Sequence, residues 1–288
     1  MQTERLFHET MILGECPVWD ERTNTLFWID ITAGQLWQHS FVLNRSNHCE
    51  FGQNIGMCCL TESEGLVIAL EKSILLVNDG FQEVLVDGIE REQPRNRMND
   101  GKCDSQGRLL VGTMHKDVKP NEAALYCLDG QSRFQRVLGN VTISNGLGWS
   151  PDNRFLYYVD TPSGILWQFD YDIETGALFN RTPLIDYSHE EGQFDGICVD
   201  AQGCIWACHW GGFQVSRWDP RSRRKLSSIR LPVPNVTSCC LGGEKMNKLI
   251  ITTGTGRDQE VKMRYPLSGA LFVCELDVPG FPANRFKR

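Results

Sequence analysis

The sequence predicts an all-β protein: a six-bladed β-propeller with four antiparallel strands per blade, formed as one domain by residues 1–288. Three observations support this prediction. A unit made of a polar turn and an apolar run recurs six times, a second apolar run follows each copy, and no segment shows helical periodicity over 11 or more residues. With 288 residues, 41% of them hydrophobic, the chain is long enough to bury the core of such a domain.

Each copy of the repeated unit begins with a turn rich in Asp, Gly, Asn or Ser and continues into a short run of β-forming residues. The copies recur at roughly 40 to 50 residues, which is the repeat length of a propeller blade. They are Asp20–Asp30, Ser63–Leu70, Asp104–Thr113, Ser150–Thr161, Asp200–Trp210 and Gly242–Thr253. A β-sandwich would not require six equivalent units spaced in this way. A β-helix has a repeat length of roughly half this period or less.

A second strand-like run follows each unit after a short turn, so each pair is predicted to form a β-hairpin. The second runs are 34–41, 72–79, 123–130, 164–172, 213–220 and 269–277. Six hairpins with their flanking strands make six blades. The segment Glu4–Glu9 is strand-like but has no hairpin partner. We expect it to pair with the last blade and close the ring, because closure removes exposed sheet edges.

The composition excludes several kinds of partner. The net charge of -7 argues against nucleic acid, because an acidic protein is repelled by phosphate backbones. The N-terminal residues lack the apolar run of a signal peptide, and no stretch approaches the roughly 18 apolar residues of a membrane-spanning helix. We expect a cytoplasmic protein without membrane association, as a monomer or weak homodimer.

The chain contains twelve cysteines, but their pattern is not that of a disulfide framework or a zinc site. No Cys-x-x-Cys pair occurs, and several cysteines stand in apolar strand-like runs. The sequence therefore predicts buried free thiols in a reducing compartment.

Polar residues stand at matched positions before four of the repeated units. In each case the residue lies five positions before the start of its unit: Glu15 before Asp20, Asn99 before Asp104, Asn145 before Ser150 and Asp195 before Asp200. The innermost strand of each blade lines the central channel of a propeller. Equal offsets in equivalent blades are thus predicted to bring these four side chains to one level of the channel.

Two carboxylates and two carboxamides make an oxygen-rich set of ligands. Such ligands suit one divalent cation, with Ca²⁺, Mg²⁺ and Mn²⁺ favoured and Zn²⁺ or Fe²⁺ as alternatives. Few protein ligands would leave positions for water and substrate. The competing interpretation is that Asn145-Gly146 and Asp195-Gly196 only form turns, which is the commoner role of such dipeptides taken singly. The matched offsets across four blades favour the metal site.

The same segments resemble the SMP-30/gluconolactonase family, whose members include sugar lactonases. The resemblance is carried by LGECPVWD from Leu13, RMNDGKCDSQGRLLVGTM from Arg97, ISNGLGWSPDNRFLYYVDT from Ile143 and FDGICVDAQGCIWACHWGG from Phe194. It extends over nearly the whole chain and implies a six-bladed propeller. It also implies that Glu15, Asn145 and Asp195 are the metal ligands.

The resemblance further implies that Arg97 and Asn99 contact the hydroxyl groups of a sugar. Asp117 is a looser match to an acidic residue that contacts substrate in the family. Met98 departs from the Pro or Phe that family members often have there, which suggests a reshaped pocket wall.

The implied activity is that of a carboxylic-ester hydrolase that opens a sugar lactone to the aldonic acid. A metal-polarised carbonyl and an activated water would carry the reaction, with Asp195 orienting or deprotonating the water. Hydrolysis of organophosphate esters and a calcium-binding propeller without turnover are the alternatives. No Gly-x-Ser-x-Gly motif supports a serine nucleophile, and non-catalytic roles are favoured for His115 and His209.

Overall fold

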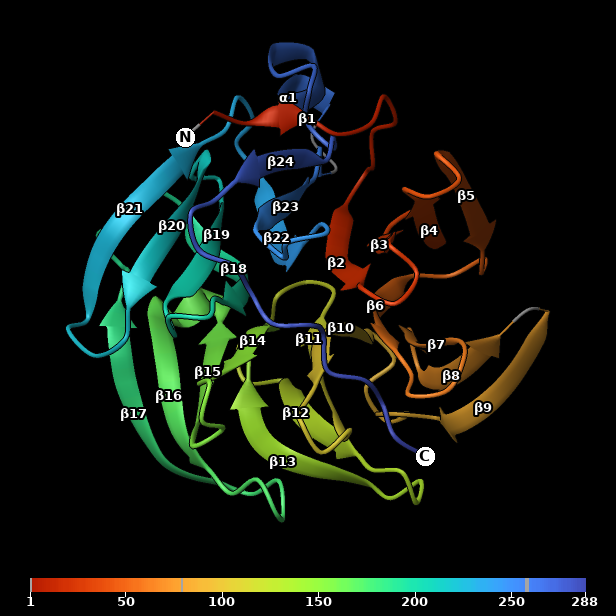
Figure 1. The fold of residues 1–288 in the computed structure, drawn as a ribbon. Coiled ribbons are helices and arrows are strands. Elements are labelled where there is room, and N and C mark those ends of the chain that lie inside the picture. Colours follow the sequence, from red (N-terminus) through yellow and green to blue (C-terminus); the bar gives the residue numbers. More distant parts are fainter. Residues whose placement is uncertain (1, 79, 257–258) are drawn as a thin grey trace.

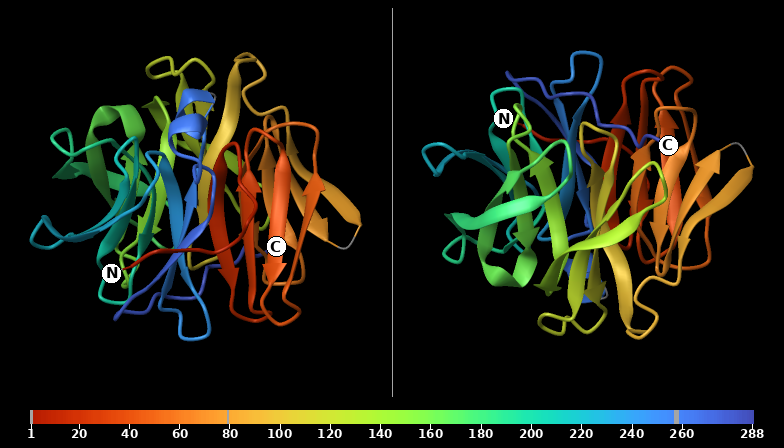
Figure 2. Two further views of the ribbon diagram at one scale, coloured as in Figure 1. Left: turned by 90° about the horizontal axis from the view of Figure 1, so that it is seen from above. Right: turned by 90° about the horizontal axis from the view of Figure 1, so that it is seen from below.

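The computed structural model describes residues 2–78, 80–256 and 259–288. It contains six four-stranded antiparallel sheets arranged like blades around a central axis (Figure 1). Two further views show the blades packed side by side around this axis (Figure 2). The predicted six-bladed propeller is confirmed; Asp79, at the end of one predicted run, lies outside the described residues.

Every blade is built in the same order from the axis outward. The innermost strands are β2 (Gly14–Asp20), β6 (Ile55–Leu60), β10 (Asn96–Cys103), β14 (Ser144–Trp149), β18 (Gln193–Val199) and β22 (Val236–Gly242). The second strands are β3 (Thr25–Asp30), β7 (Leu66–Leu70), β11 (Leu109–His115), β15 (Phe155–Asp160), β19 (Ile205–Trp210) and β23 (Lys248–Thr253). These second strands are the apolar parts of the six repeated units.

The third strands coincide with the predicted second runs. They are β4 (Gln35–Ser40), β8 (Ser73–Asn78), β12 (Ala123–Leu128), β16 (Ile165–Tyr171), β20 (Gln214–Asp219) and β24 (Phe272–Glu275). The outer strands are β5 (Arg45–Glu50), β9 (Phe81–Asp87), β13 (Phe134–Val141), β17 (Leu178–Asp186), β21 (Arg224–Arg230) and β1 (Glu4–Arg5). Two short helices complete the described chain: the 3₁₀ helix η1 (Thr161–Ser163) and α1 (Gln259–Arg264).

The ring is closed by strands from both ends of the sequence. Strand β1 pairs with β24, with Glu4 opposite Val273 and Arg5 opposite Phe272. The last blade therefore contains β22, β23 and β24 together with β1. This confirms the expected closure, although the paired segment is shorter than Glu4–Glu9.

The innermost strands all carry an irregularity in their pairing with the second strand. The register shifts fall between Glu15 and Val18, Ile55 and Met57, Met98 and Gly101, Asn145 and Leu147, Phe194 and Ile197, and Val236 and Ser238. A bulge leaves residues unpaired and redirects their side chains. All six bulges fall near the beginnings of the innermost strands, which we call the front end of the channel.

An aspartate begins three of the six repeated units, and two of these residues, Asp200 and Asp104, show how it holds the turn. Asp200 is fully buried, and its Oδ1 accepts hydrogen bonds from the backbone N–H groups of Gln202 and Cys204, each at 3.0 Å. Its Oδ2 accepts from Trp206 Nε1 at 3.0 Å and Arg217 Nε at 2.8 Å. Asp104 holds its turn in the same way, accepting from the backbone N–H groups of Gln106 and Arg108. One carboxylate thus fixes a turn and ties it to neighbouring strands.

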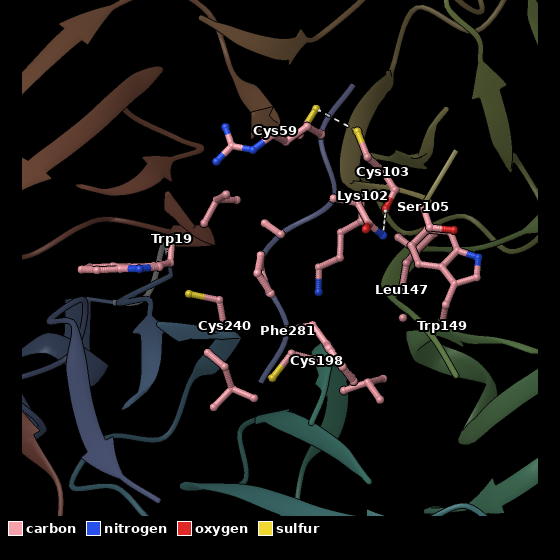
Figure 3. Close-up of a pocket in the computed structure, with 18 of the residues that line it drawn as sticks. Trp19, Cys59, Lys102, Cys103, Ser105, Leu147, Trp149, Cys198, Cys240 and Phe281 are labelled. Atoms are coloured by element: carbon pink, nitrogen blue, oxygen red, sulfur yellow. Dashed lines mark hydrogen bonds between the residues drawn. The ribbon is translucent and has the colours of Figure 1, made fainter. Parts of the chain in front are cut away.

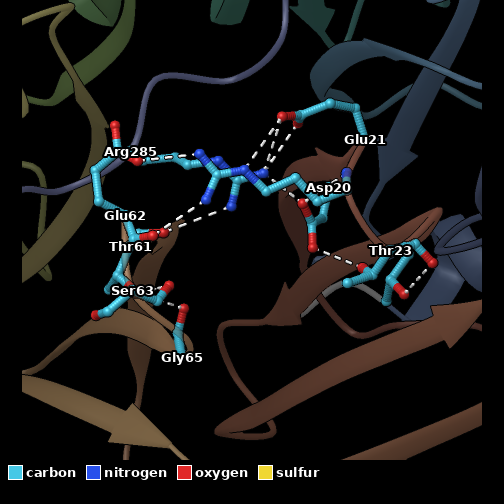
Figure 4. Close-up of polar contacts among 10 residues, drawn as sticks. Asp20, Glu21, Thr23, Thr61, Glu62, Ser63, Gly65 and Arg285 are labelled. Atoms are coloured by element: carbon cyan, nitrogen blue, oxygen red, sulfur yellow. Dashed lines mark hydrogen bonds and ion pairs between the residues drawn. The ribbon is translucent and has the colours of Figure 1, made fainter.

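The C-terminal segment crosses the opposite, rear end of the channel, where the innermost strands end (Figure 1). The guanidinium of Arg285 lies between Asp20 and Glu21, with Nη2 at 3.0 Å from Glu21 Oε2 (Figure 4). The N–H of Phe286 donates to Leu60 O at 2.8 Å, and the N–H of Lys287 donates to Gly107 O at 3.0 Å. We call residues 277–288 the C-terminal strap.

All twelve cysteines are free thiols, and ten of them are buried. This agrees with the absence of a disulfide framework predicted from the sequence. No helix among the described residues is long and apolar enough to cross a membrane.

The turn aspartate gives a test of the fold. Asp200→Ala is expected to lower the free energy of unfolding by about 3 to 5 kcal/mol, because it removes a fully buried carboxylate and leaves the partly buried guanidinium of Arg217 without its partner. Chemical denaturation measures this loss. Asp219→Ala is the matched control, because Asp219 accepts equivalent turn hydrogen bonds at the surface and should cost much less. Equal losses in the two variants would contradict this account.

Candidate metal centre

The three predicted metal ligands come from three different blades. Glu15 lies on β2, Asn145 on β14 and Asp195 on β18, and their side chains are only 7%, 5% and 7% exposed. Nδ2 of Asn145 donates hydrogen bonds to Oδ1 of Asp195 and, at 3.1 Å, to Oγ1 of Thr161. The N–H of Cys16 donates to Oε2 of Glu15 at 2.7 Å. The fold therefore brings together residues separated by up to 180 positions in the sequence.

Burial and mutual repulsion dominate the electrostatics of this cluster. The pKa of Asp195 is raised to about 8, first by burial and then by the charge of Asp100, while Asn145 and Arg97 act in the opposite direction. The pKa of Glu15 is raised well above its ordinary value by burial and by the charges of Asp195 and Asp100. A nearby cation would favour the ionised form of these carboxyl groups.

Simple alternation along a strand would turn Asp100 away from the side of its neighbour Asn99, yet its charge acts on the carboxyl groups of the cluster. The register shift between Met98 and Gly101 interrupts the alternation of side chains along β10. Asp100 is 4% exposed, and its charge raises the pKa of both Glu15 and Asp195. Its Oδ2 has no hydrogen-bond partner among the described residues. A sequence signal was available, because Asp100-Gly101 repeats the polar-glycine dipeptide seen at the other sites.

The residues present fit a divalent cation by their chemistry. Three buried carboxyl groups interact unfavourably, one of them has an orphan oxygen, and a carboxamide lies against another. Oxygen ligands of this kind are those that hard divalent cations prefer. Among the described residues, no group of three or more His, Cys, Asp or Glu side chains is arranged to hold a metal ion. The predicted ligands Glu15, Asn145 and Asp195 include only two residues of these four types, because the third ligand is a carboxamide.

Arg97 and Asn99 lie beside this cluster on β10. Arg97 Nη1 donates to Asn99 Oδ1 and to Met98 O, each at 2.8 Å. Asn99 Nδ2 donates to Ser144 O of the next blade at 2.8 Å. Both side chains are largely buried, at 8% and 7% exposed. Their hydrogen bonds hold a guanidinium and a carboxamide close to Asp195, whose pKa Arg97 lowers.

Asp117 and Met98 differ in position from the residues above. Asp117 follows β11 at the front end, is about half exposed and accepts a hydrogen bond from Arg95 Nε at 2.7 Å, which holds its pKa low. No hydrogen bond joins it to the three predicted ligands in the described part of the chain, so its contact with substrate stays a prediction. Met98 is fully buried in the core between blades, which corrects the expectation that it shapes a pocket wall.

A cavity with a volume of about 550 Å³ lies at the other end of the channel (Figure 3). Residues of all six innermost strands and of the C-terminal strap line it, among them Trp19, Cys59, Lys102, Trp149 and Phe281. Glu15, Asn145 and Asp195 are not part of its wall. We call it the rear cavity, and it is separate from the candidate metal centre.

The two histidines near the site segments, His115 and His209, make hydrogen bonds to neighbouring groups of the protein. His115 Nδ1 accepts a hydrogen bond from the N–H of Asp117 at 3.0 Å. His209 Nδ1 donates to Glu191 O at 2.9 Å, and its Nε2 accepts from Ser216 Oγ at 2.7 Å. Trp218 Nε1 in turn donates to Ser216 Oγ at 2.6 Å. This chain of hydrogen bonds satisfies a neutral imidazole, and burial lowers the pKa of His209 to about 4.

The fold and the cluster define a six-bladed propeller with carboxylate and carboxamide groups gathered at its axis. The family model described as the SMP-30/gluconolactonase/LRE-like region matches residues 13–255, and the chain belongs to this family.

Relatives of known name match along the whole chain. Regucalcin of Danio rerio is 35% identical over 286 residues, which cover 98% of this chain and 97% of that protein. Regucalcin of Xenopus laevis is 33% identical over 294 residues, covering 99% and 98%. A solved structure of luciferin-regenerating enzyme has a TM-score of 0.94 at 26% identity, and the match covers 100% of this chain and 99% of that chain.

His209 predicts a pH dependence of stability. The folded protein keeps His209 neutral down to about pH 4, whereas the unfolded chain takes up the proton near pH 6.5. Stability is therefore lost as the pH falls from about 6.5 to about 4, by about 3 kcal/mol. His209→Gln should reduce the difference in free energy of unfolding between pH 7 and pH 4 by this amount. The exposed His189→Gln is the control, and an unchanged pH dependence in His209→Gln would contradict the assignment.

Proposed function

We propose that the protein is a metal-dependent hydrolase that opens a sugar lactone of the aldonolactone class to the aldonic acid. The observation that carries the proposal is the convergence of Glu15, Asn145 and Asp195 from three blades into one buried cluster. A packed core has no need of carboxyl groups that repel one another, whereas a site for a cation does. Membership of a family that includes gluconolactonases supports the choice of a lactone as substrate.

Glu15, Asn145 and Asp195 would hold one divalent cation: Ca²⁺, Zn²⁺, Mn²⁺, Mg²⁺ or Fe²⁺. When bound, such a cation supplies Lewis acidity toward the lactone carbonyl and lowers the pKa of a bound water. Carboxamide oxygen is the ligand that hard cations take. Nδ2 of Asn145 faces Asp195 in the structure, so the carboxamide has to turn over to present Oδ1.

The chain's own residues would orient the reaction. Asp195 would hold the attacking water by a hydrogen bond and accept its proton, in the ionised form that Arg97 favours. Asn99 would donate a hydrogen bond to the carbonyl or to a ring hydroxyl, because Ser144 and Arg97 fix its carboxamide. Arg97 would donate to sugar hydroxyls and attract the carboxylate that forms when the ester bond breaks. Asp117, at the same end, would contact substrate.

Removing and restoring metal tests the function directly. The protein is stripped with a chelator, single divalent metals are returned, and acid release is followed on a panel of aldonolactones. We expect activity to vanish on stripping and to return with at least one metal, because the carboxylates alone have no electrophile to offer. The absence of activity with every metal would overturn the lactonase proposal.

Two variants test the assignment of the site. Asp195→Ala and Asn145→Ala are each expected to lower kcat/KM by about 100-fold or more, with an unchanged circular dichroism spectrum, because each removes a ligand from the cluster. Asp186→Ala, at an exposed position nine residues before Asp195, is the matched control and should keep full activity. Wild-type rates in both site variants would refute the assignment.

The same measurements separate the alternative functions. A cation-binding propeller without turnover would bind metal through the cluster but release no acid from any lactone. Hydrolysis of phosphorus esters would show as metal-dependent release from an organophosphate ester in the same assay, and we expect it as a minor activity.

A further inference from the structure

The rear cavity has the size and the lining of a binding site for a small molecule. Its volume of about 550 Å³ falls within the range of roughly 300 to 1,000 Å³ that is usual for ligand pockets. Large apolar side chains contribute to its wall, among them Trp19, Leu147, Trp149 and Phe281 (Figure 3). Such a lining favours the apolar part of a ligand, because both surfaces leave water when they meet.

One cationic side chain reaches into this cavity. Lys102 lies on β10, and its side chain points from the wall toward the middle of the cavity (Figure 3). Its Nζ donates a hydrogen bond to the carbonyl oxygen of Ile197 on β18, and to no other group in the described part of the chain. An ammonium carries three N–H donors, so two of them remain for a bound molecule or for water.

The carboxylates of the cavity wall do not neutralise this ammonium. Glu21 and Glu62 are each held by an arginine at 3.0 Å. No carboxylate of the described residues lies within ion-pair distance of Lys102. Burial lowers the pKa of Lys102, but the charge of Asp100 raises it and the net direction is upward, so the side chain stays protonated. The cavity therefore presents a positive charge in surroundings that are rich in thiols and aromatic rings.

We propose that the rear cavity is a second binding site, which takes a small organic carboxylate with an apolar body. The carboxylate accepts hydrogen bonds from the Lys102 ammonium, and the body lies against the aromatic and aliphatic wall. A cation in such surroundings attracts an anion strongly, because little water screens the charges. Thiols and aromatic rings offer few partners to the hydroxyl groups of a sugar acid, so the ligand differs from the product of the proposed function.

The C-terminal strap borders the cavity on the side that faces solvent. Residues 281–285 and Lys287 contribute to the wall, and the side chain of Phe281 is 51% exposed. Phe281 thus contacts both the cavity and the solvent, so a substitution there changes the cavity without opening the core. A carboxylate placed at this position would repel a bound anion but would not repel a neutral molecule.

Calorimetry on protein stripped of metal tests the site with three probes. Octanoate has a carboxylate and an apolar chain, octanol has the chain with a neutral head, and gluconate has a carboxylate on a hydroxylated chain. Stripping prevents a metal ion at Glu15, Asn145 and Asp195 from binding the carboxylates. We expect octanoate to bind as one equivalent and roughly 10-fold or more tightly than octanol, because a hydrogen bond to a charged group discriminates by about this factor. Gluconate should not bind.

Three outcomes of this experiment would overturn the proposal. The absence of saturable octanoate binding would exclude the site. Equal affinities for octanoate and octanol would exclude the role of the charge. Gluconate binding as tight as that of octanoate would exclude the apolar body.

Variants locate the bound carboxylate. Lys102→Met keeps an unbranched side chain without its charge, and it should weaken octanoate binding roughly 10-fold or more while leaving octanol binding nearly unchanged. Phe281→Asp should weaken octanoate binding several-fold more than octanol binding, through repulsion across the cavity. Phe81→Asp makes the same change at a residue of β9 that is 57% exposed and lies outside the cavity wall, so it is the matched control.

The strap variant keeps the test decisive if Lys102→Met does not fold, because Phe281 and Phe81 are both exposed. Octanoate affinity that is the same in Phe281→Asp and Phe81→Asp would refute binding in the rear cavity. The site is also independent of the proposed function, because none of its residues is a predicted metal ligand. A protein that hydrolyses no lactone would still bind octanoate, and a lactonase that binds no octanoate would lose only this inference.

Discussion

Closure of the ring is the constraint on which the other features depend. The pairing of β1 with β24 completes the last blade, and the last blade in turn packs against the first. Thr237 Oγ1 on β22 donates to Gly14 O on β2, across this junction. Only a closed ring keeps six innermost strands at a common distance from one axis. Glu15, on the first blade, can approach Asp195, on the fifth, only because this junction holds.

The closed ring also buries the carboxyl groups of the site, and this burial opposes folding. Buried carboxyl groups that face one another oppose folding unless a positive charge lies nearby. The chain supplies two such charges, because Arg97 acts to lower the pKa of Asp195 and Lys102 acts to lower that of Asp100. The pKa directions show that these charges do not fully offset burial and repulsion. The remaining imbalance lies at the front end, which is where a bound cation would act.

The repeated turns could be predicted because they depend on local chemistry. An aspartate at the start of a unit accepts hydrogen bonds from backbone groups two and four residues on, so the pattern is visible in the sequence itself. Matched offsets then indicated which residues stand at the front ends of the innermost strands. Glu15, Asn145 and Asp195 do gather there.

What the sequence concealed depends on geometry between distant segments. The register shift in β10 cannot be read from alternation, and it is what turns Asp100 toward the other carboxyl groups. Met98 is placed by the packing of whole blades rather than by its own neighbours. The C-terminal strap belongs to none of the six repeats, so the repeat pattern could not place it. Its position is set by Arg285, which binds Asp20 and Glu21, more than 260 residues earlier.

The short strand β1 also has a consequence for the order of events during synthesis. It is made before the other described strands, yet β24, with which it pairs among the described residues, is the last of them to be made. The first five blades contain only strands that follow one another in sequence, so each can form as soon as its own segment has emerged. The sixth cannot, and β1 must wait unpaired until β24 has been made. Five blades are therefore able to form in the order in which their strands are made, while closure of the ring has to follow the synthesis of β24.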